Sequence, residues 1–200
     1  MANLSRELET PRLILRPFAL RDAEAMYALL RDPVVNTFLP WFPLETEADA
    51  AKYPEEHYLD YYRRPSGCRY AICLRENDRP IGYLHVDDGE SHDLGYALAR
   101  PYWGRGYMTE ALAAMVRCAF ERKHVDVLAI GHFQGNHRSR RVIEKCGFQY
   151  EGTIRQGFRR YDGQVFDDVC YSILKEEYFA HPQRFQPQAV KIPKDFEKEG

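Results

Sequence analysis

The sequence predicts an α/β protein in which helices cover both faces of a mixed sheet. Three short apolar segments at 69–75, 81–87 and 93–99 are separated by turn residues, a pattern typical of an antiparallel meander. An amphipathic helix then leads to the apolar segment 125–133, which predicts a crossover connection. A chain of 200 residues is long enough for one domain with a sizeable core.

The N-terminal part supplies the helices of one face. Residues 12–18, "RLILRPF", predict a first strand that Pro17 closes. Ala23, Met26, Tyr27 and Leu30 then fall at helical spacing and predict an amphipathic helix that stops before Pro33. A second helix is expected over 46–62, where Pro54 would start, kink or split it.

The C-terminal half supplies the crossover and a hairpin. A stripe of apolar residues predicts a helix over 107–122, and the nearly continuous apolar run at 125–133 predicts a strand buried on both faces. Asn136 and Gly147 are good start and stop signals for a short helix. Strands at 148–156 and 165–174 flank the turn "YDGQ". We expect a domain over 1–180 and a loosely held polar tail over 181–200.

Composition excludes several classes of protein. The net charge is -2, so no overall basic field argues for a nucleic-acid partner. No apolar run has the length of a signal peptide core or a membrane span. The five cysteines are scattered, without a CxxC pair, which indicates a reducing compartment and no disulfide framework. We therefore expect a cytoplasmic protein that binds neither membrane nor nucleic acid.

Two glycines stand directly before the helix at 107–122, in "WGRGYMT". Bare backbone at a helix N-terminus suits an anion, because the first amides lack partners and the helix dipole favours negative charge. A turn without any ligand remains an equal reading of the glycine spacing alone. No Lys-Ser/Thr pair follows Gly106, which excludes a P-loop, and Thr109 occupies the third glycine position of a dinucleotide fingerprint.

Several segments together resemble the GCN5-related N-acetyltransferases (GNAT), and specifically the ribosomal-protein N-terminal acetyltransferases of the RimJ/RimL type. The resemblance covers about 7–178 and is carried by "ETPRLILRPF", "TFLPWFP", "IGYLHVD", "DLGYALARPYWGRGYMTEAL", "GNHRSRRVIEKCGFQYEG" and "DDVCYSIL". It implies a mostly antiparallel sheet of about seven strands, with two strands that splay apart to admit the pantetheine arm of acetyl-CoA. The matching strands are 93–99 and 127–132.

The resemblance also implies which residues bind acetyl-CoA. The family signature Gln/Arg-x-x-Gly-x-Gly/Ala falls on 103–108, with Trp103 in place of the polar first residue and Met108 in place of the small last one. Met108 also belongs to the apolar stripe of its helix, which favours a side chain in the core. Asn136 and Ser139 of "NHRS" would contact the pantetheine chain and the sulfur. The expected donor-binding residues are Leu98, Trp103, Gly104, Arg105, Gly106, Tyr107, Met108, Thr109, Asn136, Ser139 and Arg141.

Acetyl transfer to an amine needs a proton acceptor for the amine, a polarised thioester carbonyl and a proton for the thiolate. The resemblance places a general base at Asp93 and a proton donor at Ser139, and an amide between Tyr96 and Leu98 would polarise the carbonyl. Gly95 within the same strand indicates a bulge or a close approach. A solvated turn carboxylate is the alternative for Asp93, and His85 and His92 are alternative bases.

The remaining polar clusters have plain structural alternatives. A basic face on the helix at 136–147 meets CoA phosphates or is merely solvated; it comprises Arg138, Arg140, Arg141 and Lys145. The acidic run "DDGESHD" at 87–93 is a hairpin tip or an acidic mouth for a cationic amine. One of Asp167 and Asp168 is expected to bind a backbone group or an arginine. The aromatic loop at 38–42, which includes Trp41, is a candidate wall of the acceptor pocket. His132 and His137 lack a third ligand, so no metal is expected.

The functional expectation is an acetyl-CoA-dependent N-acetyltransferase in which a primary amine attacks directly within a ternary complex, as a monomer or homodimer. The resemblance favours a protein N-terminal α-amine as acceptor. Three alternatives stay open: an acetyltransferase for small amines such as amino acids, polyamines or antibiotics, a non-catalytic acyl-CoA binding module, and a phosphate-binding domain unrelated to CoA.

Overall fold

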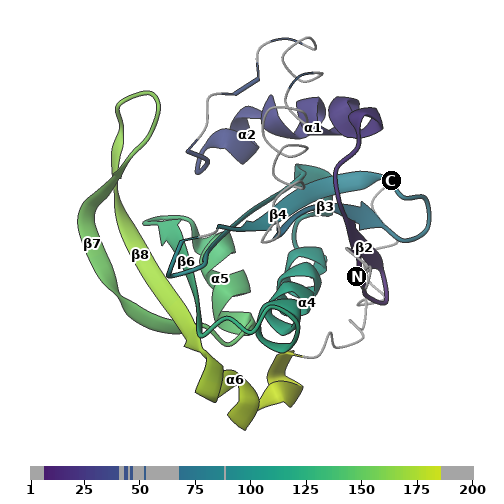
Figure 1. Ribbon diagram of the computed structural model, residues 1–200. Helices are drawn as coiled ribbons and strands as arrows, with labels where there is room; N and C mark the ends of the chain where they lie inside the picture. Colours follow the sequence, from purple (N-terminus) through teal and green to yellow (C-terminus); the bar gives the residue numbers. More distant parts are fainter. Residues whose placement is uncertain are drawn as a thin grey trace.

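The computed structural model describes residues 7–40, 43, 44, 46, 52, 68–87 and 89–185. An eight-stranded sheet runs through the molecule in the order β1-β2-β3-β4-β5-β6-β8-β7 (Figure 1). Every neighbouring pair is antiparallel except β5 and β6, which are parallel. The predicted mixed sheet, with its meander, crossover helix and terminal hairpin, is therefore confirmed.

The strands are β1 (Leu8–Glu9), β2 (Leu13–Arg16), β3 (Cys68–Leu74), β4 (Pro80–Val86), β5 (Asp93–Leu98), β6 (Val127–Phe133), β7 (Gln149–Arg159) and β8 (Val165–Leu174). The α-helices are α1 (Ala23–Leu30), α2 (Pro33–Asn36), α4 (Tyr107–Glu121), α5 (His137–Lys145) and α6 (Lys175–Ala180). Short 3₁₀ turns precede α1 and α4 and follow α6, at Leu20–Asp22, Arg100–Tyr102 and Pro182–Phe185.

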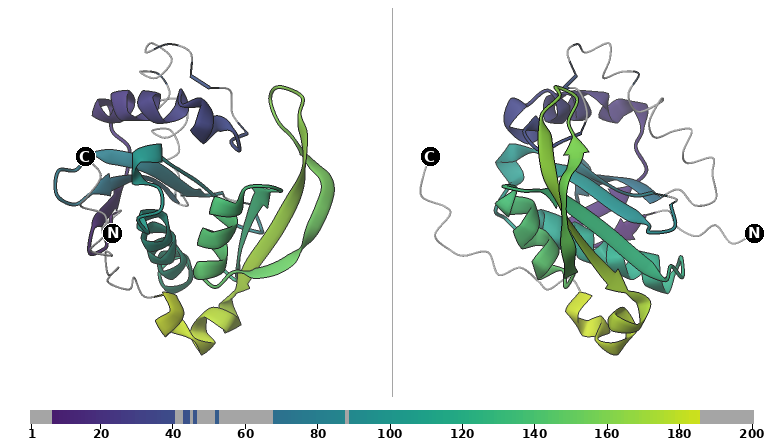
Figure 2. Two further views of the ribbon diagram at one scale, coloured as in Figure 1. Left: turned by 180° about the vertical axis from the view of Figure 1, so that it is seen from behind. Right: turned by 90° about the vertical axis from the view of Figure 1, so that its left-hand side faces the viewer.

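Helices cover both faces of the sheet, with α1 and α2 on one face and α4 and α5 on the other (Figures 1 and 2). Alternation along the strands explains the two layers, because successive side chains point to opposite faces. In β3, Ile72 packs in the cluster that contains α4, whereas Ala71 and Cys73 pack in the cluster that contains α1. Each face of the central strands thus has its own hydrophobic core.

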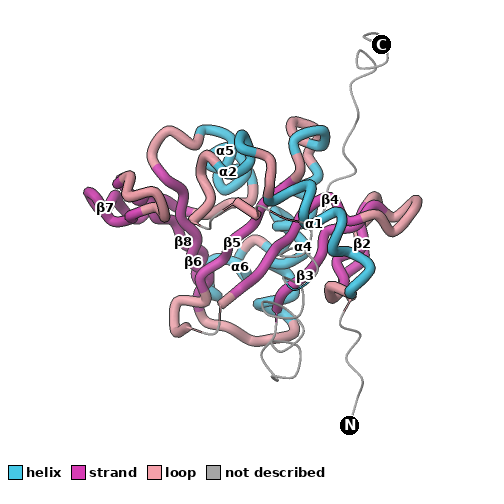
Figure 3. Tube along the Cα trace, turned by 90° about the horizontal axis from the view of Figure 1, so that it is seen from above, coloured by secondary structure: helices cyan, strands magenta, loops and turns pink. Residues whose placement is uncertain are grey.

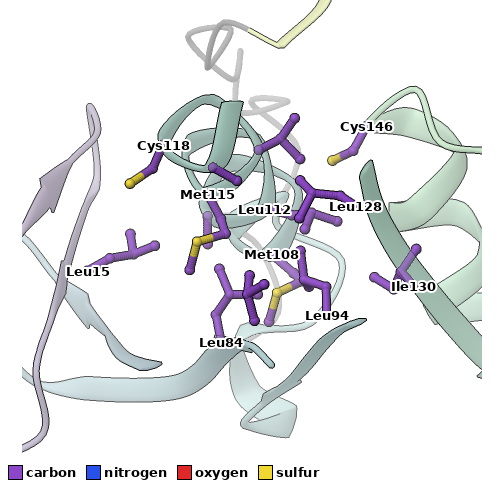
Figure 4. Packing of buried hydrophobic residues seen from close by; sticks show 14 of the residues in the cluster. Leu15, Leu84, Leu94, Met108, Leu112, Met115, Cys118, Leu128, Ile130 and Cys146 are labelled. Atoms are coloured by element: carbon purple, nitrogen blue, oxygen red, sulfur yellow. The ribbon is translucent and has the colours of Figure 1, made fainter. Parts of the chain in front are cut away.

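The larger core lies between α4 and the sheet (Figure 4). Met108, Leu112 and Met115 of α4 meet Leu84 and Leu94 of the central strands, and all five are buried. Met108 is only 5% exposed, which confirms that its side chain belongs to the core. The side chain of Met108, which departs from the family signature, therefore packs α4 against the sheet. Its backbone amide stays in the first turn of the helix.

Two short elements, β1 and α2, were not expected from the sequence, and one expectation is wrong. The sheet has eight strands instead of about seven, because the two-residue β1 pairs with β2. A short helix, α2, begins at Pro33, where the side chain of Asp32 accepts a hydrogen bond from the amide of Val34 and so caps it. The strand at 127–133 is buried on one face only, since Gly131 is exposed between the buried Ile130 and His132.

The packed C-terminal region extends past the expected boundary at 180. Helix α6 follows β8 directly, and the ring of Phe185 beyond it is 3% exposed and lies 4.9 Å from the ring of Tyr178. The helix expected over 46–62 falls, apart from residues 46 and 52, outside the described residues. None of the helices described here is long and apolar enough to cross a membrane.

Strands β5 and β6 splay apart after a short parallel contact. Only Asp93 with Ala129 and Leu94 with Ile130 are paired, although both strands continue for several residues (Figure 3). From Gly95 onward β5 pairs on its other side with β4, and β6 pairs with β8. The expected splayed pair is present, and it opens in the middle of the sheet.

Candidate active site

The loop before α4 holds two glycines in the left-handed region, Gly104 with φ +74° and Gly106 with φ +78°. Gly106 is the N-cap of α4 and offers no side chain, so no side-chain cap satisfies the first turn. The first intrahelical bond runs from the amide of Glu110 to the carbonyl of Gly106, which leaves the three preceding amides without an intrahelical partner. Space around Gly104 is open, since an added Cβ would meet nothing within 4 Å. The loop is built to present bare amides.

Trp103, which stands in place of a polar signature residue, is fixed by its own hydrogen bond. Its indole Nε1 donates to the carbonyl of Leu98 over 2.6 Å, at the point where β5 ends. The guanidinium of Arg138, from the first turn of α5, lies 4.7 Å from the centre of the indole. Trp103 therefore ties the end of β5 to the glycine loop and carries a cation–π contact to α5.

Ser139 and Tyr96 meet across the splayed strands. Their hydroxyl groups are 2.8 Å apart, and the Tyr96 hydroxyl also lies 3.4 Å from the carbonyl oxygen of Ser139. The Asn136 side-chain oxygen accepts from the amide of Ser139 over 3.2 Å, which confirms its role as the helix cap. Burial raises the pKa of Tyr96 well above its usual range, so its phenol stays protonated and available as a donor.

Asp93 stands at the first position of β5 and is exposed. The pKa of Asp93 is raised to about 6, first by desolvation and then by the nearby Asp87 and Asp168. The carboxylate of Asp168 lies close to the backbone of Gly131, where an added Cβ would be 2.8 Å from Oδ1. A carboxylate with a raised pKa accepts a proton more readily at neutral pH than an ordinary aspartate does.

The two histidines considered as alternative bases differ from Asp93. His85 is largely buried, and burial lowers its pKa to about 4, against an opposing effect of Asp87. Its ring lies close to Gly95, where an added Cβ would be 2.6 Å from Cε1, so the expected close approach at Gly95 is present. His92 has φ +47° in the preceding turn and its Nδ1 lies 3.1 Å from the carbonyl of Glu90. With a higher pKa than His85, Asp93 is the stronger base of the two.

One cavity of about 690 Å³ joins these groups. It is lined on the side of α4 and α5 by Tyr96, Ser139 and the glycine loop, and on the side of α1 and α2 by His85, Asp93 and Asp168. Most of the predicted site residues line it: Asp93, Tyr96, Leu98, Trp103, Gly104, Gly106, Tyr107, Met108, Thr109, Asn136, Ser139 and Arg141. Arg105 is exposed and does not line the cavity, and its carbonyl oxygen accepts instead from Arg12.

Several residues of this region were not expected from the sequence. The rings of Phe158 and Phe166 stack on Phe133 at 4.3 and 5.4 Å, and Phe158 lines the cavity. The long β7–β8 ribbon brings these rings toward α2, and Arg160 at its end donates to the carbonyl of Thr37 (Figure 2). Only the alternation along β7 and β8 hints at them. Of the aromatic loop, Phe38 and Pro40 line the cavity, whereas Trp41 and Phe42 lie outside the described residues.

The basic residues of α5 and the Asp167–Asp168 pair divide between the cavity and structural contacts. On α5, Arg138, Arg141 and Lys145 line the cavity, whereas Arg140 pairs with Glu144 at 2.7 Å on the surface. Asp167 accepts from the amide of Gln156 over 2.8 Å, which confirms the structural role expected for one aspartate of the pair. Within the described part of the chain, no three His, Cys, Asp or Glu side chains come together as metal ligands.

Comparisons with known proteins agree with this geometry. Residues 12–149 match the family model of the acetyltransferase (GNAT) domain. The uncharacterized N-acetyltransferase p20 of Bacillus licheniformis is 27% identical over 86% of this chain and 97% of its own length. The [ribosomal protein uS5]-alanine N-acetyltransferase of Escherichia coli is 25% identical over 86% of this chain and 92% of its own length.

The fold also matches solved structures. A GNAT-family acetyltransferase from Bacillus anthracis superposes with a TM-score of 0.75, at 23% identity, over 86% of this chain and 99% of that chain. The family model spans more than half of the 200 residues and includes the splayed strands, the glycine loop and Ser139. The chain therefore belongs to the GNAT family and is an acetyltransferase.

Proposed function

We propose that this acetyltransferase takes its acetyl group from acetyl-CoA and transfers it to a primary amine, the N-terminal α-amine of a protein. One observation carries the proposal: the uncapped N-terminus of α4 opens into the same cavity as the Tyr96–Ser139 pair and Asp93. An anion site, a proton donor and a base are the three functions that the transfer requires. Their residues come from three separate elements, α4, β5 and α5, and they meet in one cavity.

The donor fits the cofactor side of the cavity. The free amides after Gly106 and the open space at Gly104 suit a diphosphate. Beyond Leu94 none of the described strands pairs with the edge of β5 that faces β6, so its backbone groups are available to an extended pantetheine arm. Arg141 and Lys145 at the rim offer positive charge to the remaining phosphate.

The groups proposed to act on the amine and on the thioester lie on opposite faces of the sheet. Asp93 accepts the proton of the incoming ammonium, and the neutral amine then attacks the thioester carbonyl. A carbon–nitrogen bond forms and the carbon–sulfur bond breaks. The thiolate that leaves takes a proton from the Ser139 hydroxyl, which Tyr96 contacts at 2.8 Å. The proton that the nitrogen loses as the amide forms restores the Ser139 hydroxyl, so CoA leaves as the thiol and Asp93 later returns its proton to water. Strand alternation places Asp93 on the face of α1 and α2 and Tyr96 on the face of α4, so amine and thioester approach from opposite sides.

Direct attack is favoured over an acetylated cysteine. Cys170 lines the cavity, but desolvation, followed by the charges of Asp168 and Asp93, raises its pKa. Burial raises the pKa of Cys146 to about 12. A thiol needs its thiolate form to act as a nucleophile, so neither cysteine is activated for acyl transfer.

The acceptor face suits a cationic amine carried on a larger body. Asp87, Asp93 and Asp168 supply negative charge, and Phe38 and Phe158 supply apolar walls. The relative from Escherichia coli, whose printed name describes it as acetylating the alanine of a ribosomal protein, supports a protein N-terminus as acceptor.

The test measures CoA release from acetyl-CoA by thiol titration. The acceptors are peptides with a free N-terminus, the same peptides with a blocked N-terminus, polyamines, amino acids and aminoglycosides. We expect turnover with the free peptides alone. Turnover only with a small amine would move the assignment to small-molecule acetylation. Tight CoA binding without any turnover would favour a binding module.

A further inference from the structure

Arg12, which lies directly before β2 and does not line the cavity, contacts both the glycine loop and the first turn of α4. Its Nε donates to Glu110 Oε2 over 2.7 Å, and its Nη1 donates to the carbonyl of Arg105 over 3.0 Å. Its guanidinium also lies 4.3 Å from the centre of the Tyr107 ring. A single side chain therefore holds the loop, the first residue of α4 and the carboxylate one turn further on.

Arg12 neutralises the negative charge of the buried Glu110 carboxylate. The carboxylate is only 4% exposed and belongs to the first turn of α4, next to the amides that would receive a diphosphate. Unpaired, a buried negative charge at this place would repel the anion and cancel the field of the helix N-terminus. Arg12 forms an ion pair with it, and Thr10 Oγ1 donates to Oε1 over 2.6 Å.

The contact with Arg105 sets the direction in which the carbonyl oxygen of Arg105 points. In a loop that binds an anion, a carbonyl oxygen that turned toward the ligand would meet it with a partial negative charge. The hydrogen bond from Arg12 directs the Arg105 carbonyl toward β2, away from the cavity, and Arg105 itself lines none of it. With this carbonyl fixed, Gly104 and Gly106 keep their positive φ and the amides after Gly106 stay exposed to the cavity.

We propose that Arg12 is a positioning residue for the donor site, which orients the glycine loop and neutralises Glu110 so that the diphosphate of CoA meets only amides. The inference rests on the proposed use of acetyl-CoA. It assigns to the segment directly before β2, 98 residues from Glu110 in the sequence, a role in donor affinity.

The experiment measures CoA affinity by isothermal titration calorimetry for wild type, Arg12→Ala, Glu110→Gln and the double variant. Arg12→Ala should weaken CoA binding about tenfold or more, the usual consequence of losing charge-assisted hydrogen bonds. The double variant should bind CoA more tightly than Arg12→Ala alone, because the uncompensated charge is gone. A double variant that binds no better than Arg12→Ala would overturn the electrostatic part, and an unchanged Arg12→Ala would overturn the whole inference.

A truncated donor separates positioning from general damage. S-acetylpantetheine lacks the diphosphate, so Arg12→Ala should lower kcat/KM for acetyl-CoA but leave that for S-acetylpantetheine unchanged. An equal loss with both donors would assign Arg12 a merely structural role. Arg12→Lys keeps the charge and serves if the alanine variant fails to fold; it should retain more CoA affinity than alanine.

The matched control is Arg75→Ala, which removes the neighbouring arginine that donates to the carbonyl of Thr10 and to Glu9 but contacts no part of the loop. It should bind CoA like wild type, and an equal loss of affinity would count against a specific role for Arg12. If the wild-type protein itself fails to bind CoA, the proposed function fails, and this outcome is distinct from failure of the inference about Arg12.

Discussion

Asp93 owes its suitability as a base to its neighbours. An isolated aspartate with a pKa near 4 would rarely take a proton from an ammonium group. Desolvation together with Asp87 and Asp168 raises the pKa of Asp93 to about 6, whereas burial lowers the pKa of His85, the rival base, to about 4. The sequence located Asp93 but left its role open, because the approach of Asp168 depends on the register between β6 and β8.

The first prediction concerns the pH dependence of kcat/KM. Below about pH 6 Asp93 becomes protonated, so the wild-type rate should fall about tenfold per pH unit on the acidic limb. Asp93→Asn should lower the rate at neutral pH and remove that limb. Asp87→Asn is the companion variant: without one of the charges that raise the pKa, the limb should move to lower pH. A profile that neither change alters would exclude Asp93 as the base.

Ser139 and Tyr96 should behave as one unit. Their hydroxyl groups are hydrogen-bonded at 2.8 Å, so removal of either one disrupts the same proton path. Ser139→Ala and Tyr96→Phe should each lower kcat about tenfold or more with little change in CoA affinity, and the double variant should lose far less than the product of the two effects. Steady-state kinetics and calorimetry check this. Weaker CoA binding at unchanged kcat would make the pair a binding contact.

Among the secondary-structure elements, the long helices and strands could be predicted from the sequence, and the shortest ones could not. The predicted helix at 107–122 is α4, and the predicted stop at Gly147 is present with φ +83°. The two-residue β1 and the four-residue α2 are too short for any periodicity to show. The strand predicted at 125–133 was expected to be buried on both faces because Ala129 and Gly131 count as apolar residues; these small residues in fact line the cavity.

Gly106 allows a test of the uncapped helix. Alanine at φ +78° costs about 1–2 kcal/mol, so Gly106→Ala should lower thermal stability and, by disturbing the amides, weaken binding of acetyl-CoA. Gly163→Ala is a matched control: Gly163 has φ +83°, open space around it and a place in the β7–β8 turn. It should lose similar stability and keep donor affinity. Equal donor affinity in the two variants would contradict the assignment of the loop.

Over the whole molecule, the site depends on contacts that no local pattern encodes. Arg12 and Glu110 are separated by 98 positions, and Tyr96 and Ser139 by 43. The resemblance to a family supplied Ser139, Asn136 and the glycine loop as candidates. The partners that hold them in place follow from tertiary packing, which a single sequence does not specify.

Phe185, the last of the described residues, tests whether the packed domain extends past 180. Its ring is 3% exposed, packs against Tyr178 and lies beside Gly147, where an added Cβ would be 3.2 Å from its Cε1. Phe185→Ala should lower the free energy of unfolding by about 3–5 kcal/mol, as expected for a buried phenylalanine. Phe179, which is 53% exposed, is the matched control, and Phe179→Ala should cost far less in urea denaturation. Equal losses would place the end of the packed domain nearer 180.

Because donor and acceptor are proposed to approach from opposite faces of the sheet, we expect both to be bound at once when the acetyl group is transferred. The proposed base and acceptor walls lie toward α1 and α2, and the proposed proton donor and the glycine loop lie toward α4 and α5. Donor and acceptor then occupy the cavity together, so double-reciprocal plots should intersect, and acetyl-CoA alone should add no acetyl mass to the protein. Phe158→Ala should raise KM for the acceptor and leave KM for acetyl-CoA unchanged, because Phe158 lies on the acceptor side. Parallel plots with an acetylated Cys170 would instead require a covalent step, against the raised pKa of that thiol.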